Sequence, residues 1–485
     1  MKKILFTASE AVPFIKTGGL ADVAGSLPKA FRKEEYDVRV VLPLYRVIPD
    51  KYKEQMQYLT NYYVELSGEW IYAGLFQLEY DGVIFYFIDN EHYFSGDRIY
   101  EDGLWDLEKF AYFSKAALLM CEVIDYRPDI IHCHDWQTGL VPVYLKNEFY
   151  DWNRYGDFYQ GIKTIMTIHN IKFQGTWNID DMMRVTGLGG YLFTSDKLES
   201  YQNGNYLKGG LVYADWITTV SSCYADEIKY PFYGEGLDGL MRARSNNLSG
   251  IVNGIDYQEW NPETDPLIVQ NYSVDSFAEL KAKNKIALQE ELGMAVDEKR
   301  FMVGLVSRLT DQKGMDLIDC VMEDICSDDL QFVILGTGEA RYENMFRYYE
   351  WKYKDRVSSS IMYDNTRSHR IYAACDAFLM PSLFEPCGLS QLMSLRYGTV
   401  PIVRETGGLR ETVMPYNEYE NTGNGFSFAN YNAHEMLYTI QYAKYVYYNQ
   451  HERWNDIVRR GMQADYSWEA SARKYEDLYN MLLGW

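Results

Sequence analysis

The stretch Ile4-Leu5-Phe6-Thr7, followed by Lys16-Thr17-Gly18-Gly19-Leu20-Ala21-Asp22-Val23, decides the fold that we expect. A short, continuous apolar run is typical of a strand buried on both faces of a parallel sheet. Adjacent glycines let the backbone approach an anion, and the helix that starts after them points N–H groups at it. Lys16 adds a point charge suited to a diphosphate. The turn therefore predicts an anion site, and the competing interpretation is an ordinary strand-to-helix turn.

The same order of apolar run, turn signal and helical segment recurs along the chain. It recurs at residues 38–42, 83–88, 129–132, 164–168 and 216–220, and in the second half at 302–306, 332–335, 377–380 and 400–403. Strands that alternate with helices form parallel sheets covered on both faces. We therefore predict an α/β protein with two doubly wound, Rossmann-like domains.

The two series of strands divide near Gly250-Ile251-Val252-Asn253-Gly254-Ile255-Asp256, and the Gly and Pro content there and in 261–266 suits a linker. We predict domains at residues 1–250 and 251–485. Segment 467–483 has helical spacing and can pack on either domain, including back on the N-terminal one. Ligands of open parallel sheets bind beyond the carboxyl ends of the strands. The polar clusters of this chain follow strands, which predicts two domains facing a central cleft.

The composition excludes several classes of protein. The chain has 485 residues, of which 47% are apolar, so it is not a disordered polyanion. Its net charge of −22 repels phosphate backbones, and we expect no nucleic-acid partner. No stretch is long enough for a membrane span, and the N-terminal apolar run is too short for a signal peptide. The seven cysteines include no Cys-x-x-Cys pair, which favours reduced thiols and a cytoplasmic protein.

Two polar clusters follow strands of the first half. Thr167-Ile168-His169-Asn170 places His169 at a strand end, where contact with a substrate is favoured over a structural role. The other cluster is Asp129-Ile130-Ile131-His132-Cys133-His134-Asp135-Trp136. A metal site is one interpretation, but consecutive strand residues face opposite sides, so His132 and Cys133 do not readily share an ion. We favour residues that orient a substrate.

The second half carries three further clusters. Ser307-Arg308-Leu309-Thr310-Asp311-Gln312-Lys313-Gly314 places two cations beside a turn, where they can neutralise a leaving diphosphate without a metal. In Pro381-Ser382-Leu383-Phe384-Glu385-Pro386-Cys387-Gly388-Leu389-Ser390, a carboxylate that can accept sugar hydroxyls precedes a helix start whose amides can face phosphate. Glu405-Thr406-Gly407-Gly408-Leu409 repeats the Gly-Gly turn. The competing interpretation of the cations is solvated surface charge.

Several well-known sites are missing from the sequence. It contains no Asp-x-Asp, the pattern of transferases that hold a nucleotide through a divalent metal. It contains no GxxxxGK[ST] phosphate loop, the first turn is not GxGxxG, and there is no GxSxG elbow. We therefore expect no metal and no cofactor, and we do not favour a nicotinamide enzyme or a serine hydrolase.

Taken together, the motifs resemble those of bacterial glycogen synthases and plant starch synthases. Lys-Thr-Gly-Gly-Leu-Ala-Asp-Val, His-x-His-Asp-Trp, Arg-Leu-x-x-Gln-Lys-Gly and Glu-Pro-Cys-Gly-Leu stand here in order, and the resemblance covers essentially the whole chain. It implies a GT-B fold in which the donor binds mainly to the second domain. It implies a catalytic set of His169, Arg308, Lys313 and Glu385, and a donor-binding set of Lys16, Gly18, Gly19, Asp22, Asn253, Tyr363, Cys387, Gly388, Leu389 and Ser390.

The resemblance also implies the reaction. Glucose would pass from ADP-glucose to the non-reducing-end 4-hydroxyl of glycogen or another α-1,4-glucan, with retention of configuration. Arg308 and Lys313 would hold the diphosphate, His169 and Glu385 the glucose, and Tyr363 would stack on the base. Two alternatives stay open: another GT-B glucosyltransferase with a different donor or acceptor, and a non-catalytic glucan-binding scaffold of the same fold.

Overall fold

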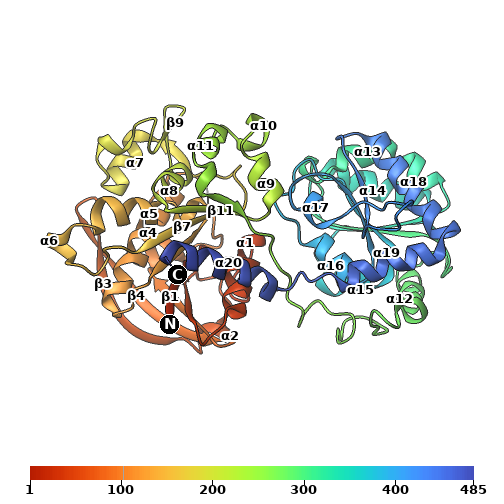
Figure 1. Cartoon of the computed structure of the whole chain (residues 1–485), viewed down its shortest axis with the longest axis horizontal. Helices are drawn as coiled ribbons and strands as arrows, with labels where there is room; N and C mark the ends of the chain where they lie inside the picture. The colour runs from red at the N-terminus through yellow and green to blue at the C-terminus, as the bar shows by residue number, and fades with distance from the viewer. Residues whose placement is uncertain (102, 485) are drawn as a thin grey trace. The chain divides into compact units, whose positions relative to one another are not determined.

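The computed structural model describes residues 1–101 and 103–484 and divides the chain into two compact units (Figure 1). The first unit comprises residues 1–220, 225–251 and the segment from Trp468 onward, and the second comprises Ser221–Tyr224 and Val252–Ser467. Segment 467–483, for which the sequence leaves both domains open, contains helix α20 (Trp468–Leu483), which belongs to the first unit. Residue 485, the predicted end of the second domain, lies outside the described residues.

The first unit is built on a nine-stranded sheet in the order β12-β11-β7-β6-β1-β2-β5-β4-β3. Its strands are β1 (Lys2–Thr7), β2 (Tyr36–Pro43), β3 (Gln57–Leu66), β4 (Glu69–Tyr80), β5 (Val83–Asp89), β6 (Ile130–His134), β7 (Lys163–Ile168), β11 (Trp216–Thr219) and β12 (Leu248–Gly250). The apolar runs predicted in the first half all form strands of this sheet and pair in parallel. Ile4, Val40 and Ile131 have no exposed surface, as expected for strands covered on both faces.

Strands β3 and β4 are not predicted from the sequence, and they make this sheet mixed instead of wholly parallel. β4 pairs antiparallel with both β5 and β3. Along β3, Tyr62 and Val64 are buried, whereas Tyr63 is 56% exposed. This period of two is typical of an antiparallel ribbon with one face in solvent. Because this alternating pattern contains no continuous apolar run, the sequence does not predict the two strands.

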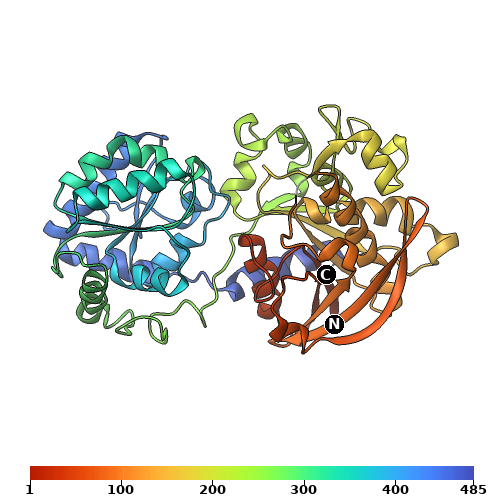
Figure 2. The same cartoon turned by 180° about the vertical axis from the view of Figure 1, so that it is seen from behind.

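Helices cover both faces of the first sheet (Figure 2). Helices α4 (Leu104–Val123), α5 (Leu140–Tyr144) and α8 (Tyr206–Tyr213) pack together, and α20 packs on the 3₁₀ turn that follows α1 (Gly19–Ser26). The Tyr479 ring of α20 stacks on Phe31 with centroids 5.6 Å apart. The shorter elements are α2 (Asp50–Lys53), α3 (Glu91–Phe94), α6 (Trp152–Tyr155), α7 (Ile179–Thr186), α9 (Ser222–Glu227), α10 (Pro231–Gly234), α11 (Asp238–Ala243), and a small sheet of β8 (Thr176–Asn178), β10 (Asn203–Asn205) and β9 (Glu199–Ser200).

The second unit holds a six-stranded sheet in the order β15-β14-β13-β16-β17-β18, and all its neighbours pair in parallel. The strands are β13 (Met302–Val306), β14 (Gln331–Leu335), β15 (Val357–Ser360), β16 (Ala377–Met380), β17 (Val400–Arg404) and β18 (Phe426–Phe428). Figure 1 shows helices above and below this sheet. They are α12 (Phe277–Glu291), α13 (Met315–Ser327), α14 (Ala340–Lys352), α15 (Asn365–Ala374), α16 (Ser390–Arg396), α17 (Gly407–Thr412), α18 (Ala433–Asn449) and α19 (His451–Gln463). The predicted doubly wound arrangement is confirmed.

Within residues 1–101 and 103–484, no helix has both the length and the apolar character needed to cross a membrane.

Candidate functional site

In the first unit, the loop after β1 carries Lys16. Its Nζ lies 2.7 Å from a carboxylate oxygen of Asp22, and half of the Lys16 side chain is exposed. Burial raises the pKa of Asp22, and the charge of Lys16 opposes that rise. The structure thus brings together two predicted site residues, a partly exposed cation and its counter-ion at the start of α1.

The Gly18-Gly19 turn is held from behind by Glu10, a buried residue that sequence reasoning does not select. The Glu10 carboxylate accepts hydrogen bonds from the backbone N–H and the hydroxyl of Thr17. Burial raises the pKa of Glu10, while bonds from Thr17 and the Gly18 backbone oppose the rise. A Cβ placed on Gly19 would meet no atom within 4 Å, so the outer side of the turn is open to a ligand. The one sequence signal for Glu10 is an acidic residue in the loop three residues after the first strand.

Three histidines gather at the ends of β6 and β7. The rings of His132 and His134 stack with centroids 4.4 Å apart, and His134 Nδ1 lies 3.0 Å from His169 Nε2. Burial lowers the pKa of His132 and of His169 to about 3, and it also lowers the pKa of His134. The imidazoles are therefore neutral at neutral pH, and His169 offers a hydrogen-bonding ring without charge.

Both ring nitrogens of His132 are already used. Nδ1 lies 2.8 Å from the Tyr479 hydroxyl of α20, and Nε2 lies 2.6 Å from Thr167 Oγ1. His132 therefore anchors the cluster and contributes no free nitrogen to a ligand. In the part of the chain that the structure describes, no three His, Cys, Asp or Glu side chains are grouped in a way that could hold a metal ion.

Asp135 links the ends of β6 and β7. Its Oδ1 accepts the backbone N–H of His169 at 2.7 Å. Burial raises the pKa of Asp135 to about 7, and hydrogen bonds from the His169 and Asn170 amides oppose the rise. Asp135 also has φ +57°, a strained conformation for a residue with a side chain. It lies within a motif that the sequence singles out, but only the hydrogen bond to His169 identifies it as a residue that orients the histidine.

In the second unit, Lys313 and Glu385 form an ion pair across two loops. Lys313 Nζ lies 2.5 Å from Glu385 Oε2, and the side chains are only 18% and 9% exposed. Ser382 Oγ donates to the same carboxylate oxygen at 3.1 Å. The loops after β13 and β16 thus bring together two predicted catalytic residues that are distant in sequence.

Two glycines allow these loops to approach so closely. Gly314 has φ +77°, and a Cβ there would lie 2.2 Å from the Pro381 carbonyl oxygen. Gly407 has φ +46°, and a Cβ there would lie 2.0 Å from the Glu385 carbonyl oxygen. Any side chain at either position would push the Glu385 loop outward. The second Gly-Gly turn therefore packs against the backbone of the Glu385 loop.

Arg308 and Tyr363 are exposed at the carboxyl ends of β13 and β15. The Arg308 side chain makes no hydrogen bond or ion pair with any described residue, and the Tyr363 ring is 88% exposed. The structure leaves both side chains available to a ligand and does not bring either into the Lys313–Glu385 cluster.

The segment from Cys387 to Ser390 leads into α16, and Gly388 has φ +76°. Burial raises the pKa of the Cys387 thiol to about 12, so Cys387 is a packed thiol beside the backbone of Asn253. Gly388, Leu389 and Ser390 are each half-buried. The Asn253 side-chain oxygen is buried, and no described residue donates to it. It is the one predicted site residue in this region with an uncommitted buried acceptor.

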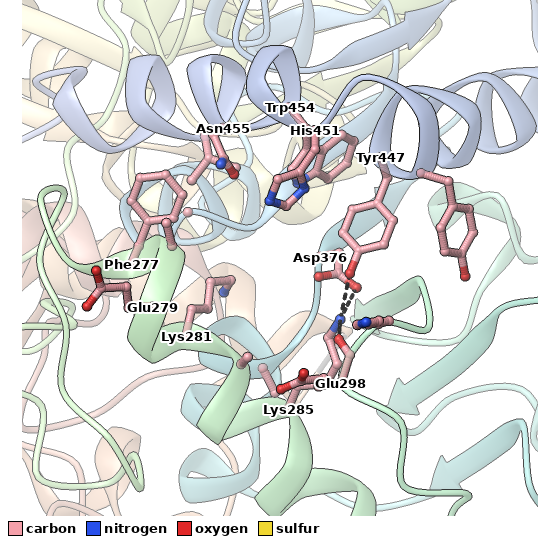
Figure 3. A pocket seen from close by; sticks show the side chains of 17 residues that line it. Phe277, Glu279, Lys281, Lys285, Glu298, Asp376, Tyr447, His451, Trp454 and Asn455 are labelled. Carbon is pink, nitrogen blue, oxygen red and sulfur yellow. Dashed lines mark hydrogen bonds and ion pairs between the residues drawn. The ribbon is translucent and has the colours of Figure 1, made fainter.

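A cavity of the second unit lies elsewhere, between α12 and the α18–α19 pair (Figure 3). It has a volume of about 450 Å³, and its lining includes the ion pair of Lys285 and Asp376. Asp376 directly precedes β16, so this cavity is at the amino end of the strand. None of the predicted site residues lines it.

The mixed sheet of the first unit and the parallel sheet of the second, with polar loops at the carboxyl ends of their parallel strands, form the arrangement of a GT-B glycosyltransferase. The family model described as starch synthase catalytic domain matches residues 3–243, and the model described as glycosyl transferases group 1 matches residues 293–457. The chain belongs to the glycogen synthase family, because full-length glycogen synthases are up to 66% identical to it.

Individual relatives support this assignment. A glycogen synthase of Lachnospira eligens is 66% identical over 99% of this chain and 100% of its own length. One from Lachnoclostridium phytofermentans is 62% identical over the same shares. The solved catalytic domain of starch synthase IV from Arabidopsis thaliana, bound to ADP and acarbose, superposes with a TM-score of 0.90 at 32% identity, covering 100% of this chain and 99% of that one.

Proposed function

We propose that the chain transfers glucose from ADP-glucose to the 4-hydroxyl at the non-reducing end of an α-1,4-glucan such as glycogen, with retention of configuration. The glycogen synthases that resemble it over nearly their whole length support the acceptor. The starch synthase IV structure, which holds ADP and acarbose, supports the nucleotide and the glucan-like ligand.

The observation that carries the proposal is the Lys313–Glu385 ion pair, with the exposed Arg308 on the same loop after β13. Lys313 and Arg308 would neutralise the diphosphate as it leaves, because preorganised cations stabilise developing negative charge. Glu385 would accept hydrogen bonds from glucose hydroxyls. The amides of Gly388, Leu389 and Ser390 would face the donor phosphates, with Cys387 packed beneath them. The Asn253 side chain would form a hydrogen bond with a glucose hydroxyl, and the Tyr363 ring would stack on the adenine.

The first unit would supply Lys16, the Gly18-Gly19 turn and His169. Asp22 holds Lys16 by its ion pair, and the ammonium would contact a phosphate oxygen of the donor. His169 would contact the glucose near the reacting carbon through its neutral ring. A neutral imidazole suits this place, because a cation there would oppose the positive charge that develops on the sugar in glycosyl transfer.

In the transfer, the bond from the anomeric carbon to the diphosphate oxygen breaks, and a bond from that carbon to the acceptor 4-oxygen forms. The proton of the acceptor hydroxyl passes to the departing phosphate oxygen on the same face of the sugar, which gives retention. The nucleotide leaves as ADP. This route needs no carboxylate nucleophile and no metal.

The test is an assay of the purified chain with ADP-glucose and glycogen, read out as ADP released and as glucose incorporated into glycogen. UDP-glucose in place of ADP-glucose tests the donor, and omission of glycogen tests for hydrolysis. We expect equal amounts of ADP and incorporated glucose, and little ADP without glycogen. Preference for UDP-glucose would favour a different donor, and absence of ADP release with tight glycogen binding would favour a scaffold.

We also propose that the protein works in the cytoplasm. All seven cysteines are free thiols in the structure, and five of them are buried. Thiols persist in a reducing compartment.

A further inference from the structure

The last residue of β17, Arg404, reaches into the loop that carries Glu385. Its Nη1 donates to the carbonyl oxygen of Leu383 at 2.7 Å and lies 3.5 Å from that of Ser382. These carbonyls stand two and three residues before Glu385. A charged donor to a carbonyl makes a stronger hydrogen bond than a neutral one. Arg404 therefore holds in place the segment Ser382-Leu383, which leads to Glu385.

The same peptide segment is held from its other side by the Lys313 turn. The Leu383 N–H donates to the Gln312 carbonyl oxygen at 2.9 Å. Leu383 is therefore fixed through its N–H by the loop after β13 and through its carbonyl by Arg404. Both loops of the Lys313–Glu385 pair meet at this residue.

Tyr431 extends the contact to the beginning of the Lys313 turn. The Arg404 guanidinium lies 5.6 Å from the centroid of the Tyr431 ring, within the range of a cation–π contact. The Tyr431 hydroxyl donates to the Asp316 carboxylate and also lies 3.1 Å from the Asp311 carbonyl oxygen. Arg404 and Tyr431 thus bridge the two loops that carry Lys313 and Glu385.

One polar atom of Arg404 is not satisfied by this arrangement. Its Nε is buried, and no described residue accepts its hydrogen. A buried donor without a partner is unfavourable. An apolar residue would avoid that cost, so packing alone does not account for a guanidinium here, whereas the bond to Leu383 does.

We propose that Arg404 is a positioning residue that, together with Tyr431, holds the Glu385 loop and the Lys313 turn at the spacing that forms the Lys313–Glu385 pair. The catalytic consequence rests on the proposed glucosyl transfer. The structural consequence, a fixed Lys313–Glu385 pair, does not.

The experiment compares Arg404→Ala, Arg404→Lys and Tyr431→Phe with a matched control, Arg356→Ala. Arg356 is also half-buried and also donates to loop carbonyls, those of Cys326, Ser327 and Asp328, but it precedes β15 and lies away from the candidate site. For each variant, kcat and KM for ADP-glucose are measured with glycogen. In parallel, the acetylation rate of Lys313 by an amine-reactive ester is followed by peptide mass spectrometry.

For Arg404→Ala we expect kcat to fall by about 10- to 100-fold, the loss typical of a small displacement of catalytic groups. Arg404→Lys should recover part of that loss, because lysine keeps one charged donor. Tyr431→Phe should give a smaller loss. Acetylation of Lys313 should accelerate in Arg404→Ala toward the rate in Glu385→Gln, which breaks the pair directly. Arg356→Ala should match the unsubstituted protein in both measurements.

Unchanged Lys313 acetylation in Arg404→Ala would overturn the proposal, whether or not activity falls. An unchanged kcat would overturn its catalytic part. If the unsubstituted protein transfers no glucose from ADP-glucose, the proposed function fails, and the acetylation measurement still decides the role of Arg404. If Arg404→Ala does not fold, Arg404→Lys and Tyr431→Phe carry the same comparison.

Discussion

At the scale of single residues, the charge of the candidate site is concentrated in a few cations. The protein as a whole carries a net charge of −22, so under the proposed function Arg308 and Lys313 would create the local positive field that a diphosphate needs. Arg308 is exposed, and the Lys313 ammonium shares its charge with Glu385 at 2.5 Å. The electrostatic field of these two side chains acts only at short range, because salt screens it beyond roughly 10 Å at exposed positions.

We predict that Arg308→Ala and Lys313→Ala each lower turnover by roughly two to three orders of magnitude. Removing one preorganised donor to leaving-group charge typically raises the barrier by about 3–4 kcal/mol. Initial rates at saturating ADP-glucose and glycogen measure this. Lys352→Ala is the control, since Lys352 also pairs with a carboxylate, Glu323 at 2.7 Å, but on the exposed surface of α14. Near-normal turnover in both site variants, with unchanged melting temperatures, would remove the diphosphate assignment.

At the scale of elements, α20 completes the core of the first unit under the histidine cluster. Tyr479 stacks on Phe31 and places its hydroxyl 2.8 Å from His132 Nδ1. The opposite nitrogen of His132 contacts Thr167 at 2.6 Å, on the strand that leads to His169. The C-terminal helix thus supports the strand ends that carry His134 and His169.

We predict that Tyr479→Phe destabilises the first unit by about 1–3 kcal/mol, because it leaves a ring nitrogen of His132 buried without a partner. The ring stacking on Phe31 is retained in this variant, so the loss of stability measures the contribution of the Tyr479 hydroxyl. Urea unfolding measures the change. Tyr63→Phe, which removes a hydroxyl from a side chain 56% exposed on β3, should change stability little. Equal effects of the two substitutions would show that the hydroxyl contact to His132 contributes nothing.

At the scale of the whole molecule, the buried histidines couple stability to pH. Burial lowers the pKa of His132 from 6.5 to about 3. Between pH 6.5 and pH 3 the His132 imidazole is protonated in the unfolded chain but neutral in the folded chain. For this group, the free energy of unfolding is therefore highest above pH 6.5 and decreases as the pH falls. Asp135, whose pKa burial raises to about 7, acts in the opposite sense and loses stability as pH rises through that value.

Three buried histidines act in the first sense and Asp135 in the second, so we predict that the free energy of unfolding falls between pH 7 and pH 5 and that His132→Gln reduces this fall. One neutral histidine contributes at most about 2 kcal/mol over that range, at 1.36 kcal/mol per unit of pKa difference. Urea unfolding curves at the two pH values give the difference for each protein. The comparison concerns the pH slope, so a uniformly less stable variant still answers the question. Identical slopes would contradict a neutral His132.

We also predict that glucosyl transfer survives metal chelation, because in the proposed function Arg308 and Lys313 would supply the charge that a divalent ion supplies in other transferases. Rates with and without EDTA, in a protein stripped of metals beforehand, test this. Complete loss that a divalent ion restores would count against the proposal and would renew the metal interpretation of the histidine cluster.

The sequence by itself predicted six of the parallel strands of the first sheet and four strands of the second, together with the polar loops that follow them. Continuous apolar runs such as Ile4–Thr7 and Val400–Val403 are local signals, because a strand covered on both faces needs apolar side chains at every position. The Gly-Gly turns are local signals as well, since close backbone approach requires glycine. The motifs on those loops then pointed to the glycogen synthase family before any contact was known.

Only the tertiary structure decided which side chains meet. The Lys313–Glu385 pair, the contact of Asp135 with the His169 amide, and the clamp of Arg404 on Leu383 join residues separated by tens of positions. No local pattern encodes such contacts, because their partners are set by strand order and loop approach. The β3–β4 ribbon was also decided by the tertiary structure, because tyrosines on both of its faces mask the period of two in the sequence. The position of α20 was decided in the same way, because its amphipathic face does not specify which unit buries it.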